Sequence, residues 1–144
     1  MFKHILLATD GTEMSSKAGE AAITLALAFS AQIIAYVCIP LYSPPPYGDF
    51  IVDIPANFIQ QCENEAQSIL NNFLSRAQAA GANCHALTNS ATSVYLGIIS
   101  TARAEKCDLI IMGSHGKRGL ADMLIGSESQ RVISHIDIPV LIYQ

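Results

Sequence analysis

The chain has 144 residues, of which 51% are hydrophobic and 14% are charged, and its formal net charge is −4. This length and apolar content indicate a single folded domain over residues 1–144 and exclude a disordered chain. No apolar run approaches the ~20 residues of a membrane helix, the first residues lack a signal-peptide pattern, and the Lys and Arg residues form no basic stripe. We therefore expect a cytoplasmic protein that binds neither membranes nor nucleic acid.

The cysteines and histidines show no metal-ligand or redox spacing. The four cysteines lie more than twenty residues apart: Cys38, Cys62, Cys84 and Cys107. A zinc site or a redox dithiol needs closely paired ligands or thiols. We predict no metal site, and we interpret the cysteines as plain buried thiols.

The first half of the chain predicts two strands and two helices. Residues 3–9 and 31–38 are short apolar runs typical of buried strands. Residues 14–30 repeat apolar side chains every three or four positions, which predicts an amphipathic helix with one face against a sheet. Residues 40–55 hold five prolines and are expected to form a long loop, and residues 56–80 form a second helical stripe that ends before a glycine.

The second half continues the alternation. Residues 82–88, 108–112 and 138–142 are predicted strands, and residues 92–106 and 127–135 are predicted helices. Apolar strands that alternate with amphipathic helices are typical of an α/β fold. We predict one open, mostly parallel sheet of five strands with helices on both faces. In such a sheet ligands bind beyond the carboxyl ends of the strands, where the strand order reverses.

A glycine-rich segment follows the fourth predicted strand. Gly113 and Gly116 are followed, after nine intervening residues, by Gly126 and Ser127 at the start of a predicted helix. Glycine lets a phosphate approach backbone N–H groups, and a helix N-terminus offers free donors to an anion. The spacing is neither a P-loop nor a dinucleotide fingerprint. The alternative is structural, because Ser127 with Gln130 also fits a capping box.

Three segments together resemble the universal stress protein family. They are Ala8-Thr9-Asp10-Gly11-Thr12, the glycine pattern Gly113, Gly116, Gly126-Ser127, and the closing Ile138-Pro139-Val140. The likeness covers nearly the whole chain, and the glycine spacing resembles the branch of the family that binds ATP. The resemblance implies a site for ATP, ADP or AMP, with Mg²⁺ as a candidate companion ion.

The resemblance places nine residues around the nucleotide: Thr9, Asp10, Val37, Met112, Gly113, Gly116, Gly126, Ser127 and Glu128. Asp10 would lie at the ribose or phosphate side with Thr9 beside it, and the Val37 backbone would lie against the adenine. Met112 and Gly113 would line the base and ribose. The two later glycines would leave room for the phosphates, and the backbone at Ser127 and Glu128 would donate to them. The Glu128 side chain is expected to face away, because it would repel a triphosphate.

Three further side chains are candidates for phosphate contacts. Lys117 and Arg118 are adjacent cations beside the glycines, and His115 precedes them. The alternatives are a solvated loop pair for the two cations and a structural or solvated role for the histidine.

Three functions remain open from the sequence. The first is a nucleotide-dependent stress-response switch or adaptor with an unidentified protein partner. The second is a slow ATPase or self-phosphorylating enzyme in which Asp10 positions magnesium or water. The third is an interaction module that works without nucleotide. No catalytic set can be assembled from the spacing, so catalytic residues are not predicted. The resemblance also implies a homodimer joined through the last strand.

Overall fold

The structure is a computed structural model that describes residues 1–41, 56–115 and 125–144. Strands and helices alternate along the described residues in the order β1 (His4–Ala8), α1 (Glu13–Phe29), β2 (Gln32–Pro40), α2 (Phe58–Ala79), β3 (Cys84–Ala91), α3 (Val94–Ala104), β4 (Leu109–Gly113), α4 (Ser127–His135) and β5 (Val140–Tyr143). This confirms the predicted alternation. The proline-rich loop falls largely on residues 42–55, which lie outside the described residues.

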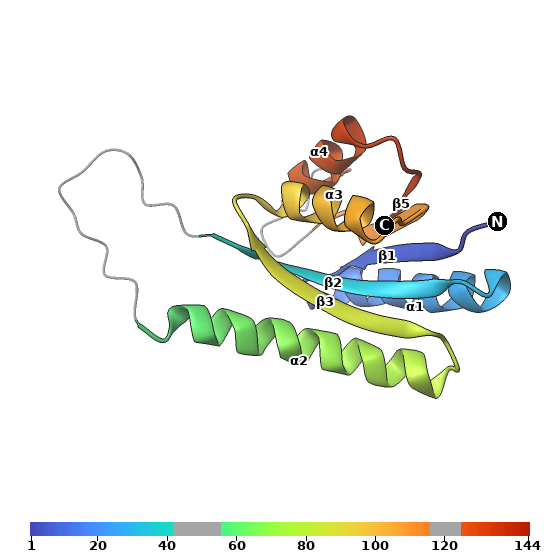
Figure 1. Ribbon diagram of the computed structural model, residues 1–144, viewed down its shortest axis with the longest axis horizontal. Helices are drawn as coiled ribbons and strands as arrows, with labels where there is room; N and C mark the ends of the chain where they lie inside the picture. Colours follow the sequence, from blue (N-terminus) through green and yellow to red (C-terminus); the bar gives the residue numbers. More distant parts are fainter. Residues whose placement is uncertain (42–55, 116–124) are drawn as a thin grey trace.

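The five strands form one parallel sheet in the order β3-β2-β1-β4-β5. Helices α1 and α2 cover one face of the sheet, and α3 and α4 cover the other (Figure 1). The predicted fold class is therefore confirmed. Because the chain runs from β1 outward to β3 and then returns to β4, the strand order reverses between β1 and β4. That point is where an open α/β sheet binds ligands.

Three helices end in the same left-handed turn. Ser30, Gly81 and Lys106 follow α1, α2 and α3 and have φ angles of 52°, 81° and 52°. After α2, the Ala82 N–H reaches back to the Ala77 carbonyl at 2.9 Å, which is the long hydrogen bond of a Schellman motif. The glycine before which the predicted stripe ends, Gly81, therefore adopts the left-handed conformation that commonly terminates a helix.

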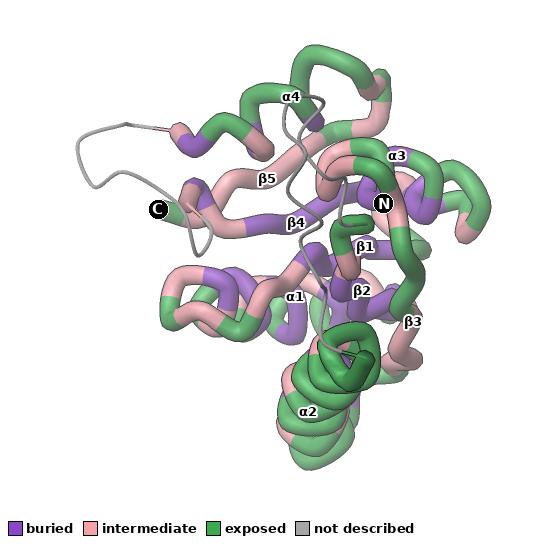
Figure 2. Tube along the Cα trace, turned by 90° about the vertical axis from the view of Figure 1, so that its left-hand side faces the viewer, coloured by how far each residue is buried: buried purple, intermediate pink, exposed green. Residues whose placement is uncertain are grey.

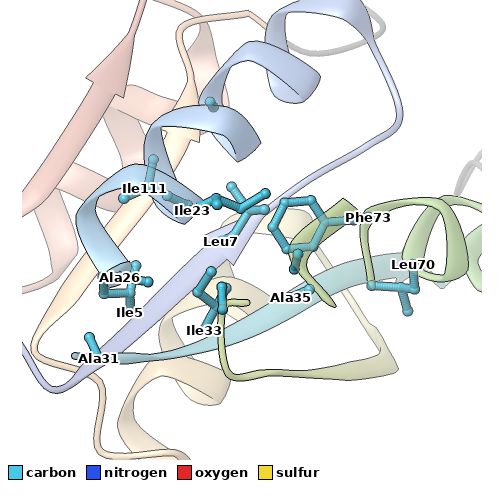
Figure 3. Packing of buried hydrophobic residues seen from close by; sticks show 14 of the residues in the cluster. Ile5, Leu7, Ile23, Ala26, Ala31, Ile33, Ala35, Leu70, Phe73 and Ile111 are labelled. Atoms are coloured by element: carbon cyan, nitrogen blue, oxygen red, sulfur yellow. The ribbon is translucent and has the colours of Figure 1, made fainter. Parts of the chain in front are cut away.

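The two faces of the sheet bury separate apolar clusters. Figure 3 shows the cluster beneath α1 and α2, in which the Phe73 ring of α2 lies beside Leu7 of β1; Leu70 of α2 and Ile33 of β2 belong to the same cluster. Phe73 is 2% exposed, so truncating it to alanine would cost about 3–5 kcal/mol. The buried strands carry both clusters (Figure 2), and this double burial explains their continuous apolar runs.

The burial pattern corrects two expectations. Of the four cysteines, Cys107 is buried, whereas Cys38, Cys62 and Cys84 are half-buried free thiols. Phe58, the first residue of α2 and part of the stripe expected to face the sheet, is 41% exposed. Each helix in the described part of the chain is too short or too polar to cross a membrane.

Candidate functional site

The carboxyl ends of β1 and β4 lie side by side, because Ala8 pairs with Met112 in the parallel register. On its other side Ala8 pairs with Tyr36 of β2, and the Thr9 N–H donates to the Tyr36 carbonyl at 3.0 Å. This register brings Thr9 next to Val37 and to the end of β4. The structure thus gathers the predicted residues of three separate segments at one edge of the sheet.

The loop after β1 holds Asp10 in a fixed orientation. The backbone N–H and the hydroxyl of Thr12 both donate to Asp10 Oδ1, at 3.1 and 2.7 Å. The Thr12 hydroxyl oxygen also accepts the Ser15 N–H at 3.2 Å and caps the N-terminus of α1. An Asx turn therefore leads directly into a helix cap, and the Asp10 carboxylate is preorganised at the sheet edge.

Gly11 makes this turn possible for two reasons. Its φ angle is 79°, in the left-handed region that favours glycine. A Cβ atom at this position would lie 2.8 Å from Ile69 Cγ1 of α2. The turn therefore packs closely against α2, and a residue with a Cβ atom at position 11 would clash with Ile69 unless Ile69 moved.

The end of β4 is tied to the start of α4. The Gly126 N–H donates to the Ser114 carbonyl at 2.6 Å, and a Cβ atom on Gly126 would lie 2.7 Å from the same oxygen. The Ser129 hydroxyl donates to the Gly113 carbonyl at 3.1 Å. These bonds place the N-terminus of α4 beside the end of β4; among the described residues, no acceptor pairs the backbone N–H groups of its first turn. The helix dipole there favours an anion.

The Glu128 side chain caps a neighbouring helix. Its Oε2 accepts the Tyr95 N–H at 2.9 Å, in the first turn of α3. Within the described residues, the N-cap residue Ser93 makes no capping hydrogen bond through its own side chain. Its Oε1 lies 3.6 Å from Arg131 Nη1, and the Arg131 guanidinium lies 5.6 Å from the centre of the Tyr95 ring. The Tyr95 ring is also 5.4 Å from that of His135. We call these four residues, Tyr95, Glu128, Arg131 and His135, the α3–α4 clasp.

A hydrogen-bonded polar cluster links the middle of β2 to β3 and α3; its Tyr36 and Thr101 are buried, whereas its Asn89 is exposed. The Tyr36 hydroxyl donates to Asn89 Oδ1 at 2.6 Å, and Asn89 Nδ2 donates to the Thr101 hydroxyl at 3.3 Å. Burial, helped by the hydrogen bond with Cys38, raises the pKa of Tyr36, and burial also raises the pKa of the Cys38 thiol. Both groups are therefore neutral near pH 7. This disfavours a nucleophilic thiolate at the site.

The structure brings together nine of the twelve predicted residues: Thr9, Asp10, Val37, Met112, Gly113, His115, Gly126, Ser127 and Glu128. Gly116, Lys117 and Arg118 lie outside the described residues. The Val37 carbonyl accepts the Thr88 hydroxyl at 2.9 Å, and His115 Nδ1 lies 2.9 Å from the Ser114 hydroxyl. The capping box that Ser127 and Gln130 suggested is absent from the described residues: Gly126 is the N-cap, and Gln130 Nε2 donates instead to Ile125 O.

Sequence reasoning missed four residues that position the site. Thr12 orients Asp10, Thr88 contacts the Val37 carbonyl, and Ser114 and Ser129 tie β4 to α4. The role of Thr12 could have been predicted, because the sequence Asp10-Gly11-Thr12 is typical of an Asx turn followed by a helix N-cap. The other three act across segments far apart in the chain, and no local pattern reports them.

No group of three His, Cys, Asp or Glu residues within the described segments lies close enough together to hold a metal ion. The polar groups at the sheet edge are backbone N–H donors, hydroxyls that donate and accept, and the Asp10 carboxylate, which accepts. Such a set fits a ligand that carries both hydroxyls and an anionic group.

Comparison with protein families gives a match over residues 1–144 to the Universal stress protein family. Universal stress protein MJ0531 of Methanocaldococcus jannaschii is 31% identical over 99% of this chain and 82% of the relative. Universal stress protein YxiE of Bacillus subtilis is 32% identical over 99% of each chain.

Solved structures share the fold. Universal stress protein UspA from Lactobacillus plantarum superposes with a TM-score of 0.79 at 19% identity, covering 99% of this chain and 97% of that one. A universal stress protein in complex with cAMP gives 0.72 at 24%, covering 99% and 97%. A family protein from Arabidopsis thaliana with AMP bound gives 0.71 at 14%, covering 98% and 90%.

Proposed function

Because the chain belongs to the universal stress protein family, we propose that it binds an adenine nucleotide at the carboxyl edge between β1 and β4. The observation that carries the proposal is the meeting of three features at the strand-order reversal: the preorganised Asp10 carboxylate, the glycine at the end of β4 and the N-terminus of α4. Family structures with cAMP and AMP support an adenine ligand.

The proposed contacts follow the chemistry of each group. Asp10 accepts from ribose hydroxyls or faces the phosphate side, and the Val37 backbone, beside Thr9, faces the base. The N-terminal turn of α4, at Ser127 and Glu128, donates backbone N–H groups to phosphate oxygens. Because Glu128 Oε2 is held by the Tyr95 N–H, its carboxylate is drawn toward α3. We propose that this geometry limits repulsion of a bound phosphate.

We propose that the chain belongs to the ATP-binding branch and that Mg²⁺ enters with the triphosphate. Asp10 supplies one carboxylate, and Oδ1 already accepts from Thr12. Mg²⁺ binds through one or two carboxylates, with phosphates and water completing its ligands. The donor set therefore fits an ion carried mainly by ATP.

The proposed role is that of a nucleotide-dependent switch or adaptor of the stress response, acting as a single cytoplasmic domain with a protein partner. A ligand shifts a protein between states only through different affinity for them. The proposed readout is a change in affinity for the protein partner when nucleotide binds; most of the segment between β4 and α4 lies outside the described residues.

Titration calorimetry on nucleotide-free protein tests the binding site. ATP, ADP, AMP and cAMP are compared with GTP, with and without Mg²⁺. A free nucleotide concentration of a hundred times Kd adds about 2.7 kcal/mol to the free energy of unfolding. For a domain of this size, this raises Tm by about 8 °C. Asp10→Asn keeps an acceptor for Thr12 but loses the charge, so we expect affinity to fall roughly tenfold. Asp137→Asn, at an exposed aspartate elsewhere, is the matched control. No heat and no change in Tm with any adenine nucleotide would sink the proposal.

We also propose a homodimer through β5. This strand is an edge of the sheet. The backbone carbonyls of Pro139 and Tyr143 accept from the N–H groups of Ile110 and Ser114, so the backbone polar groups of the odd-numbered residues point toward β4. The Ile142 N–H therefore faces the open edge, where a second strand can pair. Ile142→Pro removes this donor, and Ile142→Ala removes most of the side chain but keeps the N–H. Sedimentation equilibrium should show a monomer only for the proline variant; a monomeric parent protein would contradict the proposal.

A further inference from the structure

Glu128 brings a negative charge to the helix end that is the proposed phosphate site. It is an acidic residue in the first turn of α4, which begins after the N-cap Gly126. The backbone N–H groups of such a turn attract an anion. The Glu128 backbone N–H is one of these groups, and the carboxylate belongs to the same residue. Glu128 thus contributes one group that attracts a phosphate and one that repels it.

The structure fixes the position of this carboxylate. Oε2 accepts the Tyr95 N–H at 2.9 Å at the start of α3, and Oε1 lies 3.6 Å from Arg131 Nη1. Both oxygens are therefore held between α3 and α4, and the charge stays beside the first turn of α4. With 38% of its side chain exposed, Glu128 keeps only part of the hydration that would screen its charge.

Arg131 offsets the charge of Glu128 only in part. The Arg131 side chain is 55% exposed, so water and dissolved ions weaken its field more than they weaken that of Glu128. Its Nη1 lies near Oε1, whereas Oε2 meets the neutral N–H of Tyr95. A net negative charge therefore remains at the proposed phosphate site.

The field of Glu128 also reaches the end of β2. α3 packs closely there, because a Cβ atom on Gly97 would lie 2.7 Å from Cys38 Sγ. Burial raises the pKa of the Cys38 thiol, and the negative charge of Glu128 adds to the rise. Cys38 directly follows Val37, whose backbone is proposed to face the base. The charge of Glu128 thus acts across the carboxyl edge of the sheet.

This fixed charge makes binding depend on the charge of the ligand. Two like unit charges about 7 Å apart in a medium of dielectric constant about 60 repel each other enough to weaken binding about fourfold. The repulsion grows with each ionised phosphate oxygen, and Mg²⁺ bound to the phosphates reduces it. Given the nucleotide site proposed above, we propose that Glu128 is a specificity-determining residue. It disfavours adenine nucleotides in proportion to their phosphate charge, which biases the site toward cAMP, AMP or Mg²⁺-bound ATP and against free ATP.

Titration calorimetry of the full chain compares the parent protein with Glu128→Gln. Glutamine keeps an oxygen acceptor for the Tyr95 N–H but carries no charge. The ligands are adenosine, cAMP, AMP and ATP, whose negative charge rises in that order. We expect Glu128→Gln to leave the affinity for adenosine unchanged, to strengthen cAMP binding about threefold and to strengthen Mg²⁺-free ATP binding roughly tenfold or more. The gain for Mg²⁺-bound ATP should be smaller than the gain for free ATP.

Glu105→Gln is the matched control. Glu105 is 34% exposed and lies 3.6 Å from His85, but it follows α3 at the opposite edge of the sheet. The substitution makes the same change in net charge and should leave all four affinities unchanged. Arg131→Gln supplies a second, independent variant: it leaves the Glu128 charge without its cation, so it should weaken ATP binding more than cAMP binding.

The outcomes separate this role of Glu128 from the nucleotide site itself. Equal gains for all four ligands in Glu128→Gln, no gain for ATP, or the same gains in Glu105→Gln would overturn the role of Glu128 and leave the site standing. Failure of the parent protein to bind any adenine nucleotide would refute the site and, with it, this role.

Discussion

Glu128→Ala should destabilise the protein through the α3–α4 clasp. The substitution removes the 2.9 Å hydrogen bond from the Tyr95 N–H and the 3.6 Å ion pair with Arg131. A hydrogen bond to a charged group contributes about 1.5–3 kcal/mol, and the half-buried position of Glu128 favours the lower value. The ion pair is largely exposed and adds at most about 0.5 kcal/mol. We expect a loss of about 1.5–2 kcal/mol, or about 5 °C in Tm.

Two further variants separate the contributions. Glu128→Gln keeps an acceptor for the Tyr95 N–H and should lose about half as much free energy of unfolding. Arg131→Ala removes the ion pair and the ring contact but keeps the cap, so its cost should stay below about 1 kcal/mol. Urea unfolding followed by circular dichroism gives the free energies, and hydrogen exchange should show faster exchange at the Tyr95 amide in Glu128→Ala. An unchanged urea midpoint in Glu128→Ala, or an equal loss in Arg131→Ala, would refute the capping role.

Three other substitutions have expected outcomes that urea unfolding can measure. Gly11→Ala should lower the free energy of unfolding by roughly 2–4 kcal/mol, because it combines a left-handed φ with a 2.8 Å approach to Ile69. Gly81 is the control, because a Cβ atom there would meet open space; a smaller loss in Gly11→Ala than in Gly81→Ala would contradict this prediction. Lys106→Gly should stabilise by roughly 0.5–1 kcal/mol, because it relieves a non-glycine φ of 52°. Burial raises the pKa of the Cys107 thiol to about 12. The folded state therefore keeps this proton above pH 9 while the unfolded state loses it, so stability should fall between about pH 9 and 12, and less steeply in Cys107→Ala.

The order of elements could be predicted from the sequence because the strands are buried on both faces. Their continuous apolar runs contrast with the periodic stripes of the helices, and α4 has the same bounds as predicted, Ser127–His135. The strand ends were less accurate. β3 runs to Ala91 because Asn89 and Ser90 pair with Cys38 and Ile39 along an exposed edge, where apolar pattern carries no signal.

How well a residue of the candidate site could be predicted depends on how far along the chain its contact partners lie. Asp10 and the glycines near α4 follow from short motifs, because an Asx turn or a helix N-terminus is built by neighbours in the chain. Tyr95, the partner of Glu128, lies 33 residues away. This charged side chain meets its partner only after two helices have docked, so its role depends on helix packing that no local pattern encodes. Glu128 shows the consequence: by sequence it was an acidic residue beside a phosphate site, and in the fold its carboxylate caps another helix.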